Sequence, residues 1–117
     1  MNAIWIEIPV TDLARAKRFY EAVFEHAPTD VVDDGTRAIT VVDGQPTVSL
    51  NRTEGFRPSA DGSLPYFHLN GPLDAALARV VEHGGRVVEP VTARGDLGLF
   101  ALVADSEGNA LYLHAAP

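Results

Sequence analysis

The sequence contains no cysteine, so disulfide bonds, thiolate metal sites and a cysteine nucleophile are all excluded. Basic residues are scarce: 9 Lys and Arg stand against 16 Asp and Glu, which gives a net charge of −7 with neutral His. No segment gathers the basic residues into a patch, and this argues against nucleic acid as a partner. The acidic excess favours a cationic ligand or simply keeps the protein in solution.

Long apolar runs are absent as well. Nowhere do about 18 apolar residues follow one another, so no membrane-spanning helix is predicted. Charges at Glu7, Asp12, Arg15 and Lys17 interrupt the N-terminal stretch, which excludes the apolar core of a signal peptide. We therefore expect a cytoplasmic protein with no membrane partner. The length of 117 residues suits a single domain spanning 1–117.

What is present is a plan of elements that occurs twice. Residues 4–10 alternate between apolar and mixed side chains, which predicts a strand, and Thr11 or Asp12 can cap a helix directly after it. Three short apolar stretches separated by turn residues follow that helix: about 30–32, 37–42 and 47–51. This first unit spans about 1–57, and the Gly-, Pro- and Ser-containing segment 52–63 has the composition of a linker.

The second unit, about 62–117, repeats the plan. A strand is expected over 64–70, then a helix that ends at Gly84-Gly85, then strands at 86–90, 99–104 and 110–114. The sequence therefore predicts an α+β fold. It consists of two tandem βαβββ units whose curved mixed sheets form an open, barrel-like cavity.

Three motifs carry a resemblance to a known family. Residues 9–20 read Pro-Val-Thr-Asp-Leu-x-x-Ala-x-x-Phe-Tyr, Gly84-Gly85 stops the second helix, and residues 105–109 form an Asp-x-x-Gly-Asn turn. Together they resemble the vicinal oxygen chelate superfamily, which contains glyoxalase I, extradiol dioxygenases, fosfomycin-modifying enzymes and bleomycin-binding resistance proteins. The Trp5-x-Glu7-x-Pro9-Val10 opening is similar to its glyoxalase-related branch.

The resemblance also implies where a metal would be held. Metal-dependent members take His and Glu ligands from the first and last strands of each unit and leave positions open on a divalent ion. These positions fall on residues that are not usual ligands: Trp5, Ser49, Leu64 or Pro65, and Tyr112. We therefore expect no metal at the usual site and no cofactor, with one divalent metal ion as the alternative.

Three residues are candidates for chemistry. The mixed face of the first strand would bury the Glu7 carboxylate in the cavity, where it is placed to act as a general base. His68 and His114 belong to the strands that supply ligands in the metal-dependent relatives, and either could move a second proton. Together the three could instead form a displaced metal site.

Five further residues would line the cavity. Trp5 and Tyr112 offer aromatic faces that could stack on a flat or cationic ligand, or could simply fill the space that a metal no longer needs. Ser49, Asn51 and Tyr66 supply hydrogen-bonding groups that would orient a small molecule. Segment 92–98 resembles a loop beside the cavity of relatives and reads equally well as an ordinary hairpin loop.

These observations favour a small-molecule-binding protein that binds its ligand in the sheet cavity or transforms it without a metal. Whether it is an enzyme stays open at this point. The alternative is a metal-dependent glyoxalase-like lyase or dioxygenase that uses Glu7, His68 and His114. Because sheets of this type have exposed edges and relatives of this fold usually pair, we expect a homodimer.

Overall fold

The computed structural model describes residues 1–117 and contains two units with the same order of elements. The first unit consists of β1 (Trp5–Pro9), α1 (Leu13–Phe24), β2 (Val31–Asp33), β3 (Arg37–Val42) and β4 (Thr47–Thr53). The second consists of β5 (Tyr66–His68), α2 (Leu73–Glu82), β6 (Arg86–Ala93), a short 3₁₀ turn (Gly95–Leu97), β7 (Leu99–Ala104) and β8 (Ala110–Ala115). The predicted pair of βαβββ units is confirmed.

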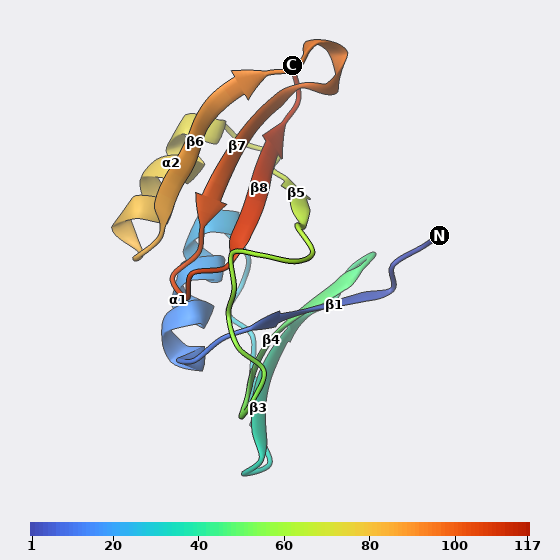
Figure 1. Cartoon of the computed structure of the whole chain (residues 1–117), viewed down its shortest axis with the longest axis vertical. Coiled ribbons are helices and arrows are strands. Elements are labelled where there is room, and N and C mark those ends of the chain that lie inside the picture. Colours follow the sequence, from blue (N-terminus) through green and yellow to red (C-terminus); the bar gives the residue numbers. More distant parts are fainter.

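Each unit forms its own four-stranded mixed sheet. The strand orders are β1-β4-β3-β2 and β5-β8-β7-β6, so the first strand of each unit lies parallel to the last and forms one edge. The two sheets share no strand pairing and do not close into a barrel. In Figure 1 the second sheet stands above the first, the helices lie on one side, and the outer end of β1 extends away from the body.

Helix α1 forms where the sequence predicts it. The Asp12 carboxylate accepts a hydrogen bond from the Arg15 N–H at 3.0 Å, which caps the first turn. The buried side chains recur every three or four residues: Leu13, Ala16, Phe19, Tyr20 and Val23. They pack with α2 and the inner faces of both sheets into one core, and full burial of a side chain such as Phe19 contributes about 1.5–3 kcal/mol.

The double glycine ends α2, as predicted, and its second member has an additional role. The Gly85 N–H donates to the Val80 carbonyl at 2.8 Å and closes the helix. A Cβ at Gly85 would lie 2.5 Å from the Ala104 carbonyl oxygen and 2.7 Å from the Phe19 ring. Only glycine lets the chain pass this close to β7 and α1, because no other residue lacks that atom.

The Asp-x-x-Gly-Asn turn between β7 and β8 joins the two units. The Asn109 amide donates to the carbonyl of Pro9, which is 100 residues away in the sequence, at 2.8 Å. The buried Tyr20 hydroxyl donates to the Asp105 carboxylate at 2.6 Å. Burial raises the pKa of Tyr20 well above its usual value, and the charge of Asp105 adds to this effect. The turn therefore anchors β1 and α1 to the second sheet.

Some strand boundaries differ from the prediction. The strand expected over 64–70 is only Tyr66–His68, because this edge strand pairs with β8 alone. The strand expected over 86–90 continues to Ala93, through two irregularities in its pairing with β7. No helix in the chain is both long enough and apolar enough to cross a membrane.

Candidate functional site

Four of the predicted site residues lie together on the first sheet, and we call them the polar row: Trp5, Glu7, Ser49 and Asn51. The parallel pairing of β1 with β4 sets Glu7 opposite Ser49 and places all four side chains on the face away from α1. The Trp5 indole N–H donates to the Ser49 hydroxyl at 3.0 Å, and the Asn51 amide donates to Glu7 Oε1 at 3.1 Å. The Ser49 hydroxyl donates to Glu7 Oε1 at 3.5 Å and joins the two pairs, so the row is a connected set of hydrogen bonds.

The burial expected for Glu7 is wrong. Its side chain is 37% exposed, because β1 is the edge strand of its sheet and has no neighbour on one side. Arg37 lies 4.0 Å from Glu7 Oε1 and adds a weak ion pair. The carboxylate is thus open to solvent and to a ligand, while Ser49 and Asn51 beneath it are buried.

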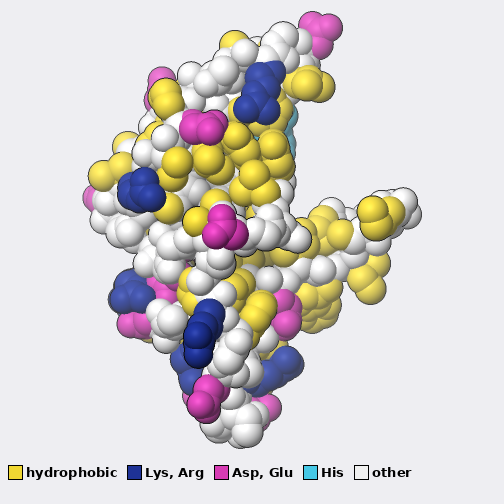
Figure 2. Space-filling view, viewed as in Figure 1, with side chains coloured by type: hydrophobic (Ala, Val, Ile, Leu, Met, Phe, Trp, Pro, Cys, Tyr) yellow, Lys and Arg dark blue, Asp and Glu magenta, His cyan; other side chains and the backbone are white.

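The second sheet carries three adjoining aromatic rings, which we call the aromatic shelf: Tyr66, Phe100 and Tyr112. Tyr66 and Tyr112 are stacked with their centroids 4.5 Å apart, and Phe100 meets both edge-on at 6.0 and 6.3 Å. Leu111 and Leu113 alternate with Tyr112 along β8 and are buried on the helix side. The shelf therefore lies on the open face, where Figure 2 shows hydrophobic side chains gathered over this sheet.

Two charged side chains contact the aromatic shelf. The Arg94 guanidinium lies over Phe100, with Cζ 4.9 Å from the ring centroid, and over Tyr112 at 5.4 Å. The Tyr112 hydroxyl donates to Glu89 Oε2 at 3.1 Å. Tyr66 is 52% exposed whereas Tyr112 beneath Arg94 is only 8% exposed, so the shelf is open to solvent chiefly at β5. The arrangement can hold a planar group against the rings, with a carboxylate beside them.

His68 and His114 contact each other through a hydrogen bond that determines their tautomers. His114 Nε2 lies 2.6 Å from the Leu97 carbonyl oxygen, which can only accept, so Nε2 carries the proton in the neutral ring. His114 Nδ1 then accepts from His68 Nδ1 at 2.9 Å. These hydrogen bonds, from His68 to the Leu97 carbonyl, join β5, β8 and the 3₁₀ turn before β7.

The residues at the usual ligand positions of the resembling family do not fit a metal ion. Trp5 offers only an N–H, which Ser49 already accepts, and an indole N–H cannot coordinate a cation. The Tyr112 hydroxyl is engaged with Glu89. The third position lies just before β5, at Leu64 or Pro65, which have no donor atom in the side chain.

The displaced set does not assemble in one chain. Glu7 belongs to the polar row through Asn51, whereas His68 and His114 are bound to each other and to Leu97. No three His, Asp or Glu side chains gather in a way that could hold a metal ion. Alternation along each strand placed the three side chains correctly on open faces, but it could not show that these faces belong to separate sheets.

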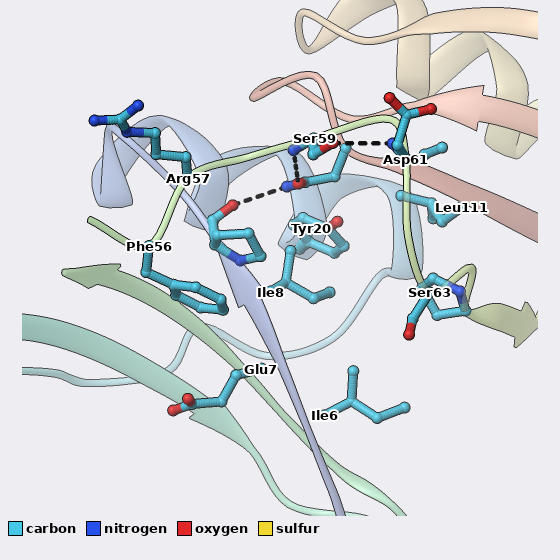
Figure 3. A pocket seen from close by; sticks show the side chains of 14 residues that line it. Ile6, Glu7, Ile8, Tyr20, Phe56, Arg57, Ser59, Asp61, Ser63 and Leu111 are labelled. Carbon is cyan, nitrogen blue, oxygen red and sulfur yellow. Dashed lines mark hydrogen bonds between the residues drawn. The ribbon is translucent and has the colours of Figure 1, made fainter. Parts of the chain in front are cut away.

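Two hollows adjoin these faces. One of about 280 Å³ lies between β1, the linker and the start of β8, with Glu7, Ile8 and Leu111 among its lining residues. Figure 3 shows the Glu7 carboxylate directed away from Ile8 in this hollow. A larger one of about 670 Å³ lies on the helix side of the first sheet, between α1 and β4, and reaches His68. The first hollow therefore meets the polar row only at Glu7, whereas the second lies on the opposite face of the first sheet from the polar row.

Sequence reasoning did not assign a role to three residues that complete the second-sheet site: Glu89, Arg94 and Phe100. The sequence could have indicated the side on which Phe100 lies, because the alternation along 99–104 places it on the same face as Leu102. Its position beside Tyr112 depends on the β7–β8 register, which sets Phe100 opposite His114. Glu89 and Arg94 reach the rings from β6 and the loop after it; segment 92–98 was predicted to lie beside the cavity, but no pattern indicated that Arg94 contacts the rings.

Comparison with known proteins identifies relatives over nearly the whole chain. The family model described as "Glyoxalase/Bleomycin resistance protein/Dioxygenase superfamily" matches residues 3–113. Curated relatives named "Putative glyoxylase CFP32", from Mycobacterium bovis and Mycobacterium tuberculosis, are 26% identical over 120 residues. The alignment covers 96% of this chain but only 44% of those proteins, so the chain spans less than half their length.

Solved structures with the same fold cover the chain from end to end. A glyoxalase/bleomycin resistance protein from Albidiferax ferrireducens has a TM-score of 0.76 at 24% identity, with 97% of this chain and 98% of that one covered. A family enzyme from Burkholderia phytofirmans has a TM-score of 0.77 at 14% identity, with both chains fully covered (100%). At these identities the likeness shows the fold.

Proposed function

Because this chain belongs to the glyoxalase/bleomycin resistance protein/dioxygenase superfamily, we propose that it binds a small organic molecule on its open sheet faces without the usual metal site. The observation that carries the proposal is the aromatic shelf. Stacked rings on an open sheet face offer a flat ligand a large contact area at little cost in conformational entropy. The polar row supplies the groups that would orient such a ligand.

The chemistry of the polar row supports binding ahead of catalysis. Ser49 and Asn51 are buried and hold their neighbours in place, so only Trp5 and Glu7 present free surface to a ligand. Trp5, which is 50% exposed, gives a stacking face, and the Glu7 carboxylate gives a hydrogen-bond acceptor or a partner for a cation.

We also propose a homodimer. Large apolar side chains are exposed along the edges of both sheets, including Ile4 at 82%, Trp5 at 50%, Val32 at 63% and Tyr66 at 52%. Edge strands with apolar side chains are the usual points of association between sheets, and a two-fold axis would use the same edge twice. Such a dimer would cover β1 and enclose the polar row.

The proposal is tested by metal analysis and ligand screening on the same preparation. Protein purified without a chelator or a metal column is analysed by elemental mass spectrometry, and the expected result is far less than one divalent ion per chain. The single tryptophan, Trp5, then reports ligands through its fluorescence in a screen of small aromatic compounds. A hit should lose affinity in Trp5→Ala or Tyr66→Leu, measured by calorimetry because Trp5→Ala removes the only tryptophan.

Glu7→Gln separates the binder from an enzyme. In a binder it should weaken the ligand only modestly, whereas an enzyme that uses Glu7 as its base would lose turnover of the same compound. One tightly held divalent ion per chain that disappears in Glu7→Ala or His114→Ala would contradict the proposal and favour the metal-dependent alternative. An unaltered ligand affinity in both Trp5→Ala and Tyr66→Leu would contradict the placement of the site.

A further inference from the structure

The aromatic shelf is already in contact with a cationic side chain, that of Arg94. Of the basic side chains, Arg94 alone lies over aromatic rings, and it lies over two of them, at 4.9 Å from Phe100 and 5.4 Å from Tyr112. Arg94 makes no ion pair with a carboxylate, in contrast to the other arginines that lie near acids. The ring faces are therefore its chief partner, and a planar guanidinium fits them.

The charge around the shelf favours the same kind of group. Glu89 accepts a hydrogen bond from the Tyr112 hydroxyl, so a carboxylate stands at the rim of the rings. A hydroxyl that donates to a carboxylate also makes its ring richer in electrons, which strengthens the attraction for a cation above it. The chain as a whole carries −7, so the long-range field acts in the same direction.

The backbone of the loop that carries Arg94 is held by hydrogen bonds and close packing, whereas the Arg94 side chain is exposed. The Arg94 N–H donates to the Gly98 carbonyl at 2.9 Å, and His114 holds the Leu97 carbonyl at 2.6 Å. Gly98 itself touches β8, since a Cβ there would lie 2.3 Å from the Ala115 carbonyl oxygen. The exposed Arg94 side chain can therefore leave the rings without any change in the backbone.

We propose that the aromatic shelf is a binding site for a flat cation of the guanidinium or amidinium class, and that Arg94 competes with this ligand for the same ring faces. The inference rests on the proposed function and specifies the charge and shape of its ligand. Cation–π contacts at exposed sites are weak, so an external cation with an aromatic body can replace the arginine. By competing for the rings, Arg94 would then lower the apparent affinity of the site for an external cation.

The test uses three probes of one shape and different charge: benzamidine, benzamide and benzoate. Binding of each to the 117-residue chain is measured by calorimetry and by NMR shifts of the tyrosine ring protons. The variant is Arg94→Gln, and its matched control is Arg57→Gln, which removes the same charge from an exposed linker residue. Tyr66→Leu, at an exposed ring, tests the shelf without disturbing the core.

We expect benzamidine to bind and the other two probes to bind more weakly. Arg94→Gln should tighten benzamidine binding by about two- to fivefold relative to Arg57→Gln, the factor that corresponds to one exposed cation–π contact. Tyr66→Leu should weaken it, with an unchanged circular dichroism spectrum as evidence of folding.

Three outcomes would overturn the inference. Equal benzamidine affinity in Arg94→Gln and Arg57→Gln would show that Arg94 does not compete. Benzoate binding that is lost in Arg94→Gln would show that Arg94 binds an anionic ligand and does not compete with a cationic one. A preference for neutral benzamide would leave a stacking site with no charge selectivity; in these three cases the proposed function survives. Probes that shift no tyrosine signal at all would overturn the shelf as a cation site, and the proposed function would then depend on ligands found through Trp5 fluorescence.

Discussion

At the scale of single residues, Gly98 shows how tightly the loop before β7 is held. Its φ of +107° with ψ of −154° belongs to a region open almost only to glycine, and the site is buried against β8. A Cβ would lie 2.8 Å from His114 Nε2 as well as against the Ala115 carbonyl. We predict that Gly98→Ala lowers the free energy of unfolding by more than about 2 kcal/mol, measured by urea denaturation.

The matched control for this prediction is Gly62→Ala. Gly62 also has a positive φ, +97°, but nothing lies within 4 Å of its Cβ position. It should therefore cost only the backbone strain, about 1 kcal/mol. If the two variants lose the same stability, the close approach of β8 to Gly98 contributes nothing.

For single residues of the site, the sequence predicted what depends on neighbouring positions and not what depends on distant ones. The alternation along β1 correctly placed Trp5 and Glu7 on one face, because that pattern is local. The exposure of Glu7 was predicted wrongly, because the sequence does not say which strand of a sheet lies at its edge. Segment 92–98 was predicted to lie beside the cavity, but its sequence did not indicate the contact of Arg94 with Phe100.

At the scale of elements, Glu107 caps a helix that belongs to the other unit. Its buried carboxylate accepts the N–H groups of Thr11 and Asp12 at 2.9 Å and binds Arg15 at 2.8 Å, at the N-terminus of α1. Burial by itself would raise the pKa of Glu107, but hydrogen bonds from Arg15, Asp12 and Thr11 outweigh it and lower the pKa from 4.5 to about 2. The ionised form is therefore held by the folded state.

This lowered pKa predicts that the folded protein loses stability in acid. A folded-state pKa below the unfolded one means that the stabilisation is full above pH 4.5 and is lost as the pH falls towards 2. A shift of this size corresponds to at most about 3 kcal/mol, and solvent screening lowers this value because Arg15 is 46% exposed. In urea titrations between pH 7 and 2, Glu107→Gln should be less stable at pH 7 and should lose this part of the pH dependence.

The control for Glu107 is Glu54→Gln, an exposed carboxylate after β4 with no ion pair. It should leave both the stability at pH 7 and its pH profile unchanged. A Glu107→Gln profile parallel to that of the unaltered chain would contradict the role of the carboxylate in capping α1.

At the scale of the whole molecule, the open edge of the first sheet bears on assembly. Ile4 is 82% exposed directly before β1, whose outer end extends from the body in Figure 1. We predict that the 12.5 kDa chain forms a dimer through this edge, and that Ile4→Lys shifts it to the monomer in analytical ultracentrifugation. Val81→Lys, which changes an exposed apolar residue on α2, should leave the mass unchanged. A monomer at all concentrations for the unaltered chain would refute the proposal.

The sequence by itself determined the elements, their order and the face on which each strand residue lies. Turn residues, the Asp12 cap and the two side-chain periods act over a few neighbours, so they can be read locally. The repeat of those elements then implied two similar units, and the shared motifs indicated the family.

Only the tertiary structure decided which side chains meet. The separation of Glu7 from His68 and His114, the placement of Arg94 on the aromatic shelf and the capping of α1 by Glu107 all depend on contacts between distant segments. Such contacts follow from strand register and from the packing of the two units against each other. These are collective results of burying one shared core, and no short stretch of sequence encodes them.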